Sequence, residues 1–342
     1  MPDIFEPGIH HDYPVADYHA DPTPEPSLSS TSARTVINEC LHKAWLQHPR
    51  YGAAAAAQDD RLSLGTAAHT LLFERGRGLV EVEASDWRTN SAKARRQDIL
   101  SAGQIPILSK HMEVAKTMAE RITDQMAMHH LAPAFFGEEM TGWNKQDEVA
   151  LFWQEEIGGR PIWCRNLLDR FCVSKKRWCI FDLKTTERSV APHSLAAFAT
   201  GQGHDIQAAM AVRGLQNLIS SPITDRLEFY FIYAEVEPPH LITVGRISRQ
   251  MLVLGSKKVA QAMALWARAQ ADNNWPGYPR TSVELLPPPY AETSWLNREL
   301  NDPGLVATEN DPFLMSSPWI PRHDNHSDPV KGQDHGHPND SD

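Results

Sequence analysis

Two acidic residues and one lysine stand in a pattern that suits metal-dependent hydrolysis. Asp182 and Lys184 lie two residues apart in the apolar run 180–186, and Asp169 precedes Asp182 by thirteen residues. In an extended strand, side chains two residues apart point to the same face, so a carboxylate and an ammonium would converge there. The residues between and beside them, Phe181 and Leu183, would point into the opposite layer.

Hydrolysis of a phosphodiester requires an activated water and stabilisation of the charge that builds on the phosphate oxygens, and a carboxylate-bound Mg²⁺ can supply both. Mg²⁺ usually takes only one or two protein carboxylates and keeps several waters. Asp169 and Asp182 would form such a minimal site, and Lys184 would orient the water or the phosphate. The alternative is that Asp182 and Lys184 form an ordinary surface salt bridge.

The segment between the two aspartates favours a hairpin. Asp169 lies in the apolar run 163–173, and the polar link 174–177 separates this run from the next one. A short polar link between two apolar runs is typical of a hairpin. We therefore expect the two strands to pair and to bring Asp169 beside Asp182.

Several separated motifs occur in an order that resembles one nuclease family. They are Tyr18–Asp21, Ser27–Ser32, the Gly-Thr-Ala-Ala-His motif within Leu64–Leu72, Glu148, Arg165–Asp169, Phe181–Thr186, Asp205–Met210 and the Trp-Pro-Gly-Tyr motif Trp275–Tyr278. The set resembles the RecE-like (exonuclease VIII) branch of the PD-(D/E)xK superfamily, which includes the RecB-type nuclease domains, over residues 13 to 290. It implies a phage or prophage-type member.

This resemblance implies an α/β fold in which a mixed sheet is flanked by helices, a restriction-endonuclease-like core with an N-terminal helical elaboration. It also implies an Mg²⁺-dependent exonuclease, with Mn²⁺ as a substitute, that resects double-stranded DNA ends to single strands for recombination by annealing. A RecT-like single-strand annealing protein would be the partner. A homo-oligomeric ring around DNA would fit the same role.

The resemblance also assigns roles to residues. The implied metal ligands are Asp169, Asp182, His69 and the backbone carbonyl of Leu183. Lys184 and Gln207 would position water and phosphate, and Glu148 would assist. Without the resemblance, His69 on its apolar helix face would be interpreted as a hydrogen-bonded core residue, and Glu148 as a solvent-facing turn residue.

Three positions depart from the family pattern. Leu168 replaces the proline before the first metal aspartate, and Ala211 replaces a tyrosine four residues after Gln207. His204 replaces an aromatic residue that precedes the glutamine. These changes bear on substrate handling more than on metal binding. Changes such as Leu168 and Ala211 leave open a catalytically idle DNA-binding or assembly module. An endonuclease stays open because the same metal chemistry serves both activities, and a protein that is not a nuclease stays open if Asp182 and Lys184 form only a salt bridge.

A basic cluster precedes the predicted catalytic segments. Arg88, Lys93, Arg95 and Arg96 lie in a stretch with few apolar residues. Such a cluster could contact DNA phosphates, which supply most of the sequence-independent affinity for DNA, or could be a solvated surface. The net charge of -10 does not exclude DNA, because the acidic ends 1–26 and 321–342 carry nearly all of it.

The chain is expected to contain one large domain with irregular ends. Residues 1–26 are proline-rich and acidic, which predicts a flexible terminus, residues 27–290 form the nuclease domain, and 291–342 form an extension that is disordered from about 321. The tail contains four histidines that could bind metals adventitiously. The four cysteines of the chain lack the spacing of an iron–sulfur site and are expected to be buried. Few cysteines and no long apolar run predict a cytoplasmic protein without a membrane segment.

Strand and helix patterns follow from hydrophobic periodicity. Strands are predicted near 148–156, 160–173, 178–185, 226–234 and 241–247, and helices near 106–131, 205–218 and 248–272.

Overall fold

The computed structural model describes residues 5–52, 64–73, 78–223 and 225–301. The chain divides into two compact units, Met1–Tyr278 and Pro279–Asp342. The first unit contains the sheet and every predicted catalytic residue. Its end at Tyr278 precedes the domain boundary that the sequence suggested at 290.

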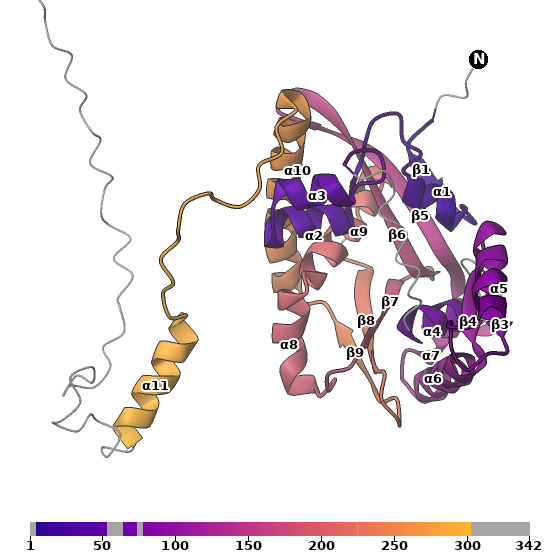
Figure 1. The fold of residues 1–342 in the computed structure, drawn as a ribbon. Helices are drawn as coiled ribbons and strands as arrows, with labels where there is room; N and C mark the ends of the chain where they lie inside the picture. The colour runs from indigo at the N-terminus through magenta and orange to yellow at the C-terminus, as the bar shows by residue number, and fades with distance from the viewer. Residues whose placement is uncertain (1–4, 53–63, 74–77, 224, 302–342) are drawn as a thin grey trace, which may run out of the picture. The chain divides into compact units, whose positions relative to one another are not determined.

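A seven-stranded mixed sheet is the centre of the first unit (Figure 1). Its strands follow the spatial order β1, β5, β6, β7, β8, β9, and β2 pairs with β6 beside this path. The bounds are β1 Gly8–His10, β2 Leu28–Ser29, β5 Asn144–Ile157, β6 Arg160–Val173, β7 Trp178–Thr186, β8 Leu227–Glu235 and β9 Ile242–Arg246. The five strands predicted from periodicity are confirmed, and the fold class is the predicted mixed α/β one.

The hairpin between β6 and β7 forms as predicted. Ser174 closes it, because its backbone N–H donates to the carbonyl of Arg177 over 2.9 Å and its hydroxyl donates to the same carbonyl over 2.8 Å. The two strands are antiparallel, whereas β7 and β8 run parallel along the whole length of β7.

One edge of β6 is shared between two partners, which creates a fork in the sheet. β7 pairs with β6 only over residues 170–173, and β2 pairs with residues 164 and 165 further along the same strand. The fork between β2 and β7 thus leaves residues 166–169 of β6 without a strand partner on this edge.

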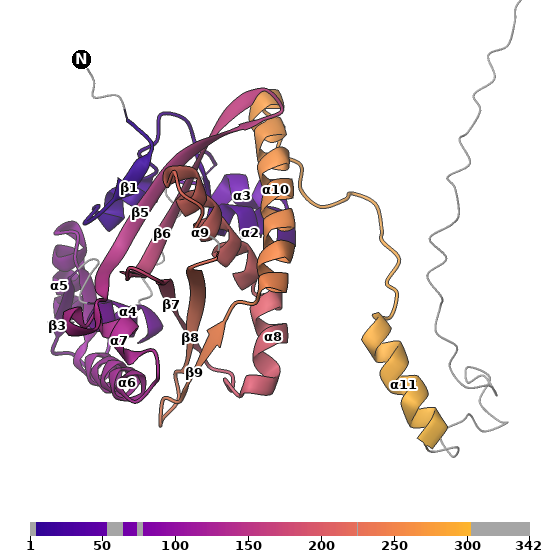
Figure 2. The same cartoon turned by 180° about the vertical axis from the view of Figure 1, so that it is seen from behind.

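Helices cover both faces of the sheet, and two hydrophobic cores result (Figures 1 and 2). One core contains residues of α2 Ser30–Asn38, α8 Pro192–Gly201, α9 His204–Leu218 and α10 Arg249–Asp272, with α3 Leu41–Gln47 beside them. The other contains residues of α4 Leu64–Phe73, α6 Ser109–Ala127 and α7 Ala132–Phe136. Alternation along β7 separates them, since Ile180 lies in the first core and Phe181 and Leu183 in the second.

A small additional module packs beside α4 and α6. It consists of the parallel strands β3 Leu79–Val82 and β4 Ile105–Leu108, with α5 Asn90–Ser101 between them in the chain. Further along the chain, a 3₁₀ turn at Glu139–Thr141 precedes β5. Ile107 of β4 packs with Ala67 of α4 and Met112 of α6. Helix α5 carries three of the four residues of the predicted basic cluster.

The N-terminal segment differs from the flexible terminus that its prolines predicted. From residue 5 onward it is ordered against the sheet: β1 pairs with β5, and α1 Val15–Ala20 buries Tyr18. Asp21, directly after α1, is buried and contacts Arg165 of β6 through an ion pair of 3.0 Å. Tertiary partners thus fix a segment whose local sequence has little preference for regular structure.

The second unit contains one helix within its described part, α11 Pro289–Asn301. The histidine-rich tail, predicted to be disordered from about 321, lies outside the described residues. Three of the four free cysteines are buried as expected: Cys164, Cys172 and Cys179. No helix in the described ranges has the length and apolar character needed to cross a membrane.

Candidate active site

Three carboxylates lie side by side across three strands at the fork. Asp182 directly follows Phe181, and Asp169 directly precedes Arg170, the residue paired with Phe181. On the other side of β6, Glu148 and Asp169 stand between the registered pairs Asp147–Arg170 and Val149–Leu168. The sheet thus brings Glu148, Asp169 and Asp182 into one row, although 34 residues separate the first from the last.

Asp169 is held by groups from two other elements. Its Oδ2 atom accepts a hydrogen bond from the backbone N–H of Leu183 at 3.0 Å and lies 3.1 Å from Nε2 of His69. Burial acts to raise the pKa of Asp169, but His69, Lys184 and the Leu183 amide outweigh it, and the pKa is lowered. The sequence implied the Leu183 carbonyl as a ligand, whereas the contact described here is through its N–H; the carbonyl's role stays a prediction.

Asp182 is buried and crowded by like charge. Burial, followed by the charge of Asp169, raises the pKa of Asp182 to about 6. Lys184 forms an ion pair with its Oδ1 atom, and the Gln207 amide of α9 donates a hydrogen bond to Oδ2. The side chains of Asp182 and Lys184 therefore share a face, as the strand alternation predicted, and Gln207 reaches them from the helix above.

Glu148 is buried and has an unusual backbone. Its φ angle of 52° lies in the left-handed region, which is uncommon for a residue other than glycine and interrupts the pairing of β5 with β6. Its charge is also among those that raise the pKa of His69. The structure thus places Glu148 beside the other acids, and not in a solvent-facing turn.

His69 reaches the row because α4 approaches β7 very closely. A Cβ atom on Gly65, at the start of α4, would lie 2.0 Å from Oγ1 of Thr185, so only glycine permits this approach. One helical turn later, His69 faces Asp169 and packs against Phe73, with 4.7 Å between ring centroids. Burial opposes its protonation, but the charge and hydrogen bond of Asp169 prevail and the pKa of His69 is raised.

The site fits a divalent cation in its donor chemistry. Mg²⁺ prefers hard oxygen ligands and takes few of them from the protein. Oδ1 of Asp182 is buried and is compensated by the ion pair with Lys184, with no directed hydrogen bond from the described residues. In the described ranges, no three His, Cys, Asp or Glu side chains are arranged to enclose an ion by themselves. Asp169 and Asp182 supply two carboxylates, both largely buried.

The three departures from the family pattern are all core positions. Leu168 and Ala211 are buried in the core on the α9 face. His204 is buried as well, and its Nδ1 atom lies 3.0 Å from the hydroxyl of Tyr233 while its ring stacks on Phe231. These residues are thus part of the core beside the site, and the carboxylates keep their own partners.

The predicted basic cluster lies on the separate module of α5 and the two short strands. Arg88 is 3.7 Å from Asp86, and Arg96 lies over the ring of Trp87 at 5.6 Å. Lys93 and Arg95 are exposed on α5. A role in binding DNA stays a prediction.

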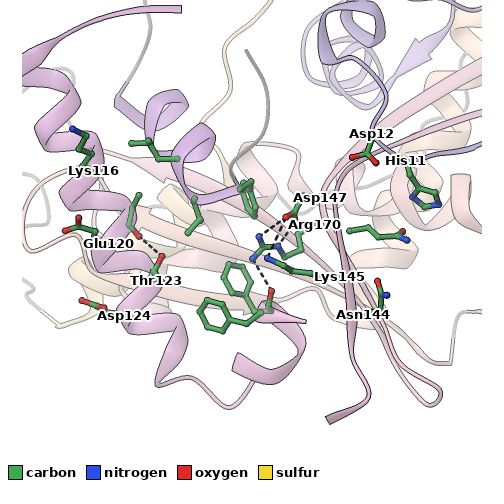
Figure 3. A pocket seen from close by; sticks show the side chains of 17 residues that line it. His11, Asp12, Lys116, Glu120, Thr123, Asp124, Asn144, Lys145, Asp147 and Arg170 are labelled. Atoms are coloured by element: carbon green, nitrogen blue, oxygen red, sulfur yellow. Dashed lines mark hydrogen bonds and ion pairs between the residues drawn. The ribbon is translucent and has the colours of Figure 1, made fainter. Parts of the chain in front are cut away.

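A cavity of about 1060 Å³ is lined by residues of α4, α6, α7, β5 and β6, and none of the three acids is among its lining residues (Figure 3). At its floor, Arg170 donates two hydrogen bonds to Asp147, of 2.6 and 3.0 Å, and lies over the rings of Phe73 and Phe135. Asp147 and Arg170 are the chain neighbours of Glu148 and Asp169. Asp147 and Arg170 neutralise each other and link β5 to β6 next to Glu148 and Asp169. We therefore assign this pair a structural role and no role in the chemistry.

Two solved structures resemble this chain to different degrees. A crystal structure from Eubacterium rectale, named a putative exonuclease, is 14% identical, with a TM-score of 0.50 and coverage of 83% of this chain and 99% of its own. The protein VC1899 from Vibrio cholerae is 11% identical, with a TM-score of 0.20 and coverage of 76% and 58%. The first similarity supports the fold, and the second is too weak to carry a conclusion.

No curated protein sequence matches this chain. Residues 30–282 match the family described as a PDDEXK-like domain of unknown function (DUF3799). This range includes β6 and β7, the carboxylate row and the helices that carry His69 and Gln207, whereas β2 lies just before it. The chain belongs to this PDDEXK-like family.

Proposed function

We propose that the protein is an Mg²⁺-dependent deoxyribonuclease that digests double-stranded DNA from its ends. The row of Glu148, Asp169 and Asp182 at the fork, with Lys184 and Gln207 directed at Asp182, is the observation that carries the proposal. Membership of a PDDEXK-like family supports a nuclease, and the Eubacterium rectale structure of related fold is named a putative exonuclease.

Asp169 and Asp182 would hold the cation, with His69 beside them and the Leu183 carbonyl as a further ligand. When bound, Mg²⁺ or Mn²⁺ would activate water and stabilise charge on the phosphate. The Leu183 amide fixes Asp169, so this carboxylate needs no reorganisation when substrate arrives. The short strand pairing beyond the fork leaves room for the phosphate.

Lys184 and Gln207 would position the reactants. Lys184 projects beside Asp182 and is about one-quarter exposed, so its ammonium can turn to a phosphate oxygen or a water. The Gln207 amide donates to Asp182, which leaves its carbonyl oxygen available to accept a hydrogen bond from the attacking water. Glu148, at the edge of the row, would accept a proton from the same water.

The substrate and partner assignments depend on the resemblance to the RecE-like branch. We propose that the protein resects duplex ends to single strands for recombination by annealing, that a RecT-like annealing protein takes up the product, and that a homo-oligomeric ring encircles the DNA. Arg88, Lys93, Arg95 and Arg96 are proposed to contact phosphates outside the fork.

Digestion of end-labelled linear duplex DNA tests the activity. The wild type and Asp182→Ala are compared with Mg²⁺ and with EDTA, and covalently closed circular DNA serves as the control substrate. We expect Mg²⁺-dependent release of short products from linear DNA by the wild type alone. Cleavage of circular DNA would indicate an endonuclease, and DNA binding without cleavage would indicate an idle module.

A further inference from the structure

Arg34 occupies a distinctive place beside the fork. It lies in α2, which starts directly after β2, the strand that forms one side of the fork. Ser29 fixes the start of this helix, since its hydroxyl accepts a hydrogen bond from the N–H of Ser32 at 3.1 Å. Ala33 and Val36 bury one face of α2 in the core, and Arg34 lies outside that buried face.

The stem of Arg34 packs across the start of α9, the helix that carries Gln207. Gly203 caps α9 with a φ of 70°, and a Cβ atom there would lie 2.6 Å from Cγ of Arg34 and 3.0 Å from Nδ2 of Asn38. Arg34 and Asn38 are one helical turn apart, so they form a polar stripe along this contact. The glycine therefore lets α2 and α9 approach and fixes the direction of the arginine stem.

The charge of Arg34 has no acidic partner among the described residues. Most of the site's other charges are compensated, since Lys184 pairs with Asp182 and His69 pairs with Asp169. Lys184 and Arg34 also act on the same neighbour: burial, then Lys184, then Arg34 lower the pKa of His204 to about 3. A half-buried arginine at this point, near the site and without a counter-charge, differs from a freely solvated surface residue.

We propose that Arg34 binds a backbone phosphate of the DNA strand that lies in the fork, next to the phosphate that is cut. This inference rests on the proposed nuclease function and adds a residue to its substrate site. Phosphate contacts by arginine position a nucleic acid without reading its sequence. Asn38, one turn along α2, would donate a second hydrogen bond to the same backbone.

Equilibrium binding in EDTA tests this contact without turnover. The full-length wild type is compared with Arg34→Met, which keeps an unbranched stem, with Arg34→Lys, and with Arg160→Met as the matched control. Arg160 is exposed at the far end of β6, roughly 30 Å along the strand from Asp169. Thermal melting of each variant verifies that it is folded.

We expect Arg34→Met to weaken binding to a labelled duplex by on the order of tenfold. The slope of log affinity against log salt should fall by about 0.9, the value for one phosphate contact. Arg34→Lys should keep the salt slope and lose part of the affinity, because lysine lacks the planar fork of donors. Arg160→Met should match the wild type in both measurements.

Uncharged backbone linkages can locate the phosphate that Arg34 contacts. A methylphosphonate replaces one linkage at a time in the labelled strand, and each duplex is bound by the wild type and by Arg34→Met. One linkage should weaken the wild type but not weaken Arg34→Met further, since the variant has already lost that contact. Additive effects at every linkage would overturn the proposal.

The two levels of the proposal fail in different ways. Wild-type cleavage of linear DNA, together with an Arg34→Met variant that binds like Arg160→Met, would overturn only the Arg34 contact. A wild type that neither binds nor cuts DNA would overturn the nuclease function and this contact together.

Discussion

Two buried aspartates, Asp21 and Asp182, differ in the donors and charges that surround them. Asp21 receives hydrogen bonds from Thr23 at 2.6 Å and from the backbone and side chain of Ser27, as well as the ion pair with Arg165. Asp182 is equally buried, but its nearest charged neighbours include another carboxylate. The pKa of Asp21 is lowered far below its usual range, whereas the pKa of Asp182 is raised to about 6.

His48 is a further hydrogen-bond donor to Asp21. Nδ1 of His48 accepts from the N–H of Arg50 at 3.2 Å, so its Nε2 carries the proton and donates toward Asp21 and Ser27. Burial would raise the pKa of Asp21, but these donors outweigh it. Asp21 is therefore a structural carboxylate that ties the N-terminal segment to β6.

The difference shows how a functional carboxylate can be distinguished from a structural one. The protein satisfies the charge at Asp21 with its own donors, so nothing further is needed there. At Asp182, burial and the like charge of Asp169 oppose the ion pair with Lys184. A buried carboxylate crowded by a second carboxylate is suited to a cation, and four experiments test this contrast.

The largest effect is expected for Asp182→Asn. Loss of one metal carboxylate should reduce cleavage of linear DNA at least about a hundredfold. In EDTA the variant should melt at the same temperature as the wild type or higher, because the repulsion with Asp169 is removed. A marked loss of stability would instead make Asp182 a structural residue like Asp21.

Asp21→Asn should have the opposite profile. It leaves Arg165 buried without its counter-charge, which costs about 3–5 kcal/mol of unfolding free energy. The folded fraction should cut DNA at the wild-type rate per molecule. Chemical denaturation measures the first effect, with exposed Asp17→Asn as control; a stable Asp21→Asn protein with impaired cleavage would contradict our distinction.

Divalent cations should stabilise the wild type selectively. Binding to the folded state alone adds about 2.7 kcal/mol at a hundredfold excess over Kd. Melting temperature with increasing Mg²⁺ or Mn²⁺ should therefore rise for the wild type and for Asp17→Asn, and much less for Asp182→Asn. Because all three proteins retain the histidine-rich tail, an equal rise in all of them would assign the binding elsewhere.

The smallest effect concerns pH. The folded pKa of Asp21 is lowered, so its contribution to stability is fully present above its unfolded pKa of about 3.9 and is lost as pH falls toward the folded value. The stability difference between the wild type and Asp21→Asn should therefore be constant above about pH 5 and shrink below pH 4. A difference that stayed constant in acid would show that the carboxylate charge is not what stabilises the N-terminal segment.

Local pattern was sufficient to predict the elements that carry the acids. The alternation in 180–186 correctly placed Asp182 and Lys184 on one face, and the polar link 174–177 correctly predicted the hairpin. Both signals are short-range consequences of backbone geometry. The glycine of the Gly-Thr-Ala-Ala-His motif, Gly65, is explained by close packing, since α4 contacts Thr185 at this residue.

Sequence pattern could not reveal the order of the N-terminal segment or the place of Arg34. Prolines and acids in residues 5–26 indicate irregular structure, and only the contacts of Asp21 with β6 and of β1 with β5 fix the segment. Arg34 belongs to no recognisable motif, and only its packing against Gly203 at the start of α9 suggested a role for it.

The sequence by itself determined the five strands from β5 to β9, the hairpin between β6 and β7 and the residue types suited to metal-dependent hydrolysis, because these depend on periodicity and side-chain chemistry. Only the tertiary structure decided that Glu148, Asp169 and Asp182 form one row, that β2 and β7 leave a fork beside it, and that α4, α9 and α2 bring His69, Gln207 and Arg34 toward it. These arrangements depend on strand register and helix packing between segments far apart in the chain, which no local pattern encodes.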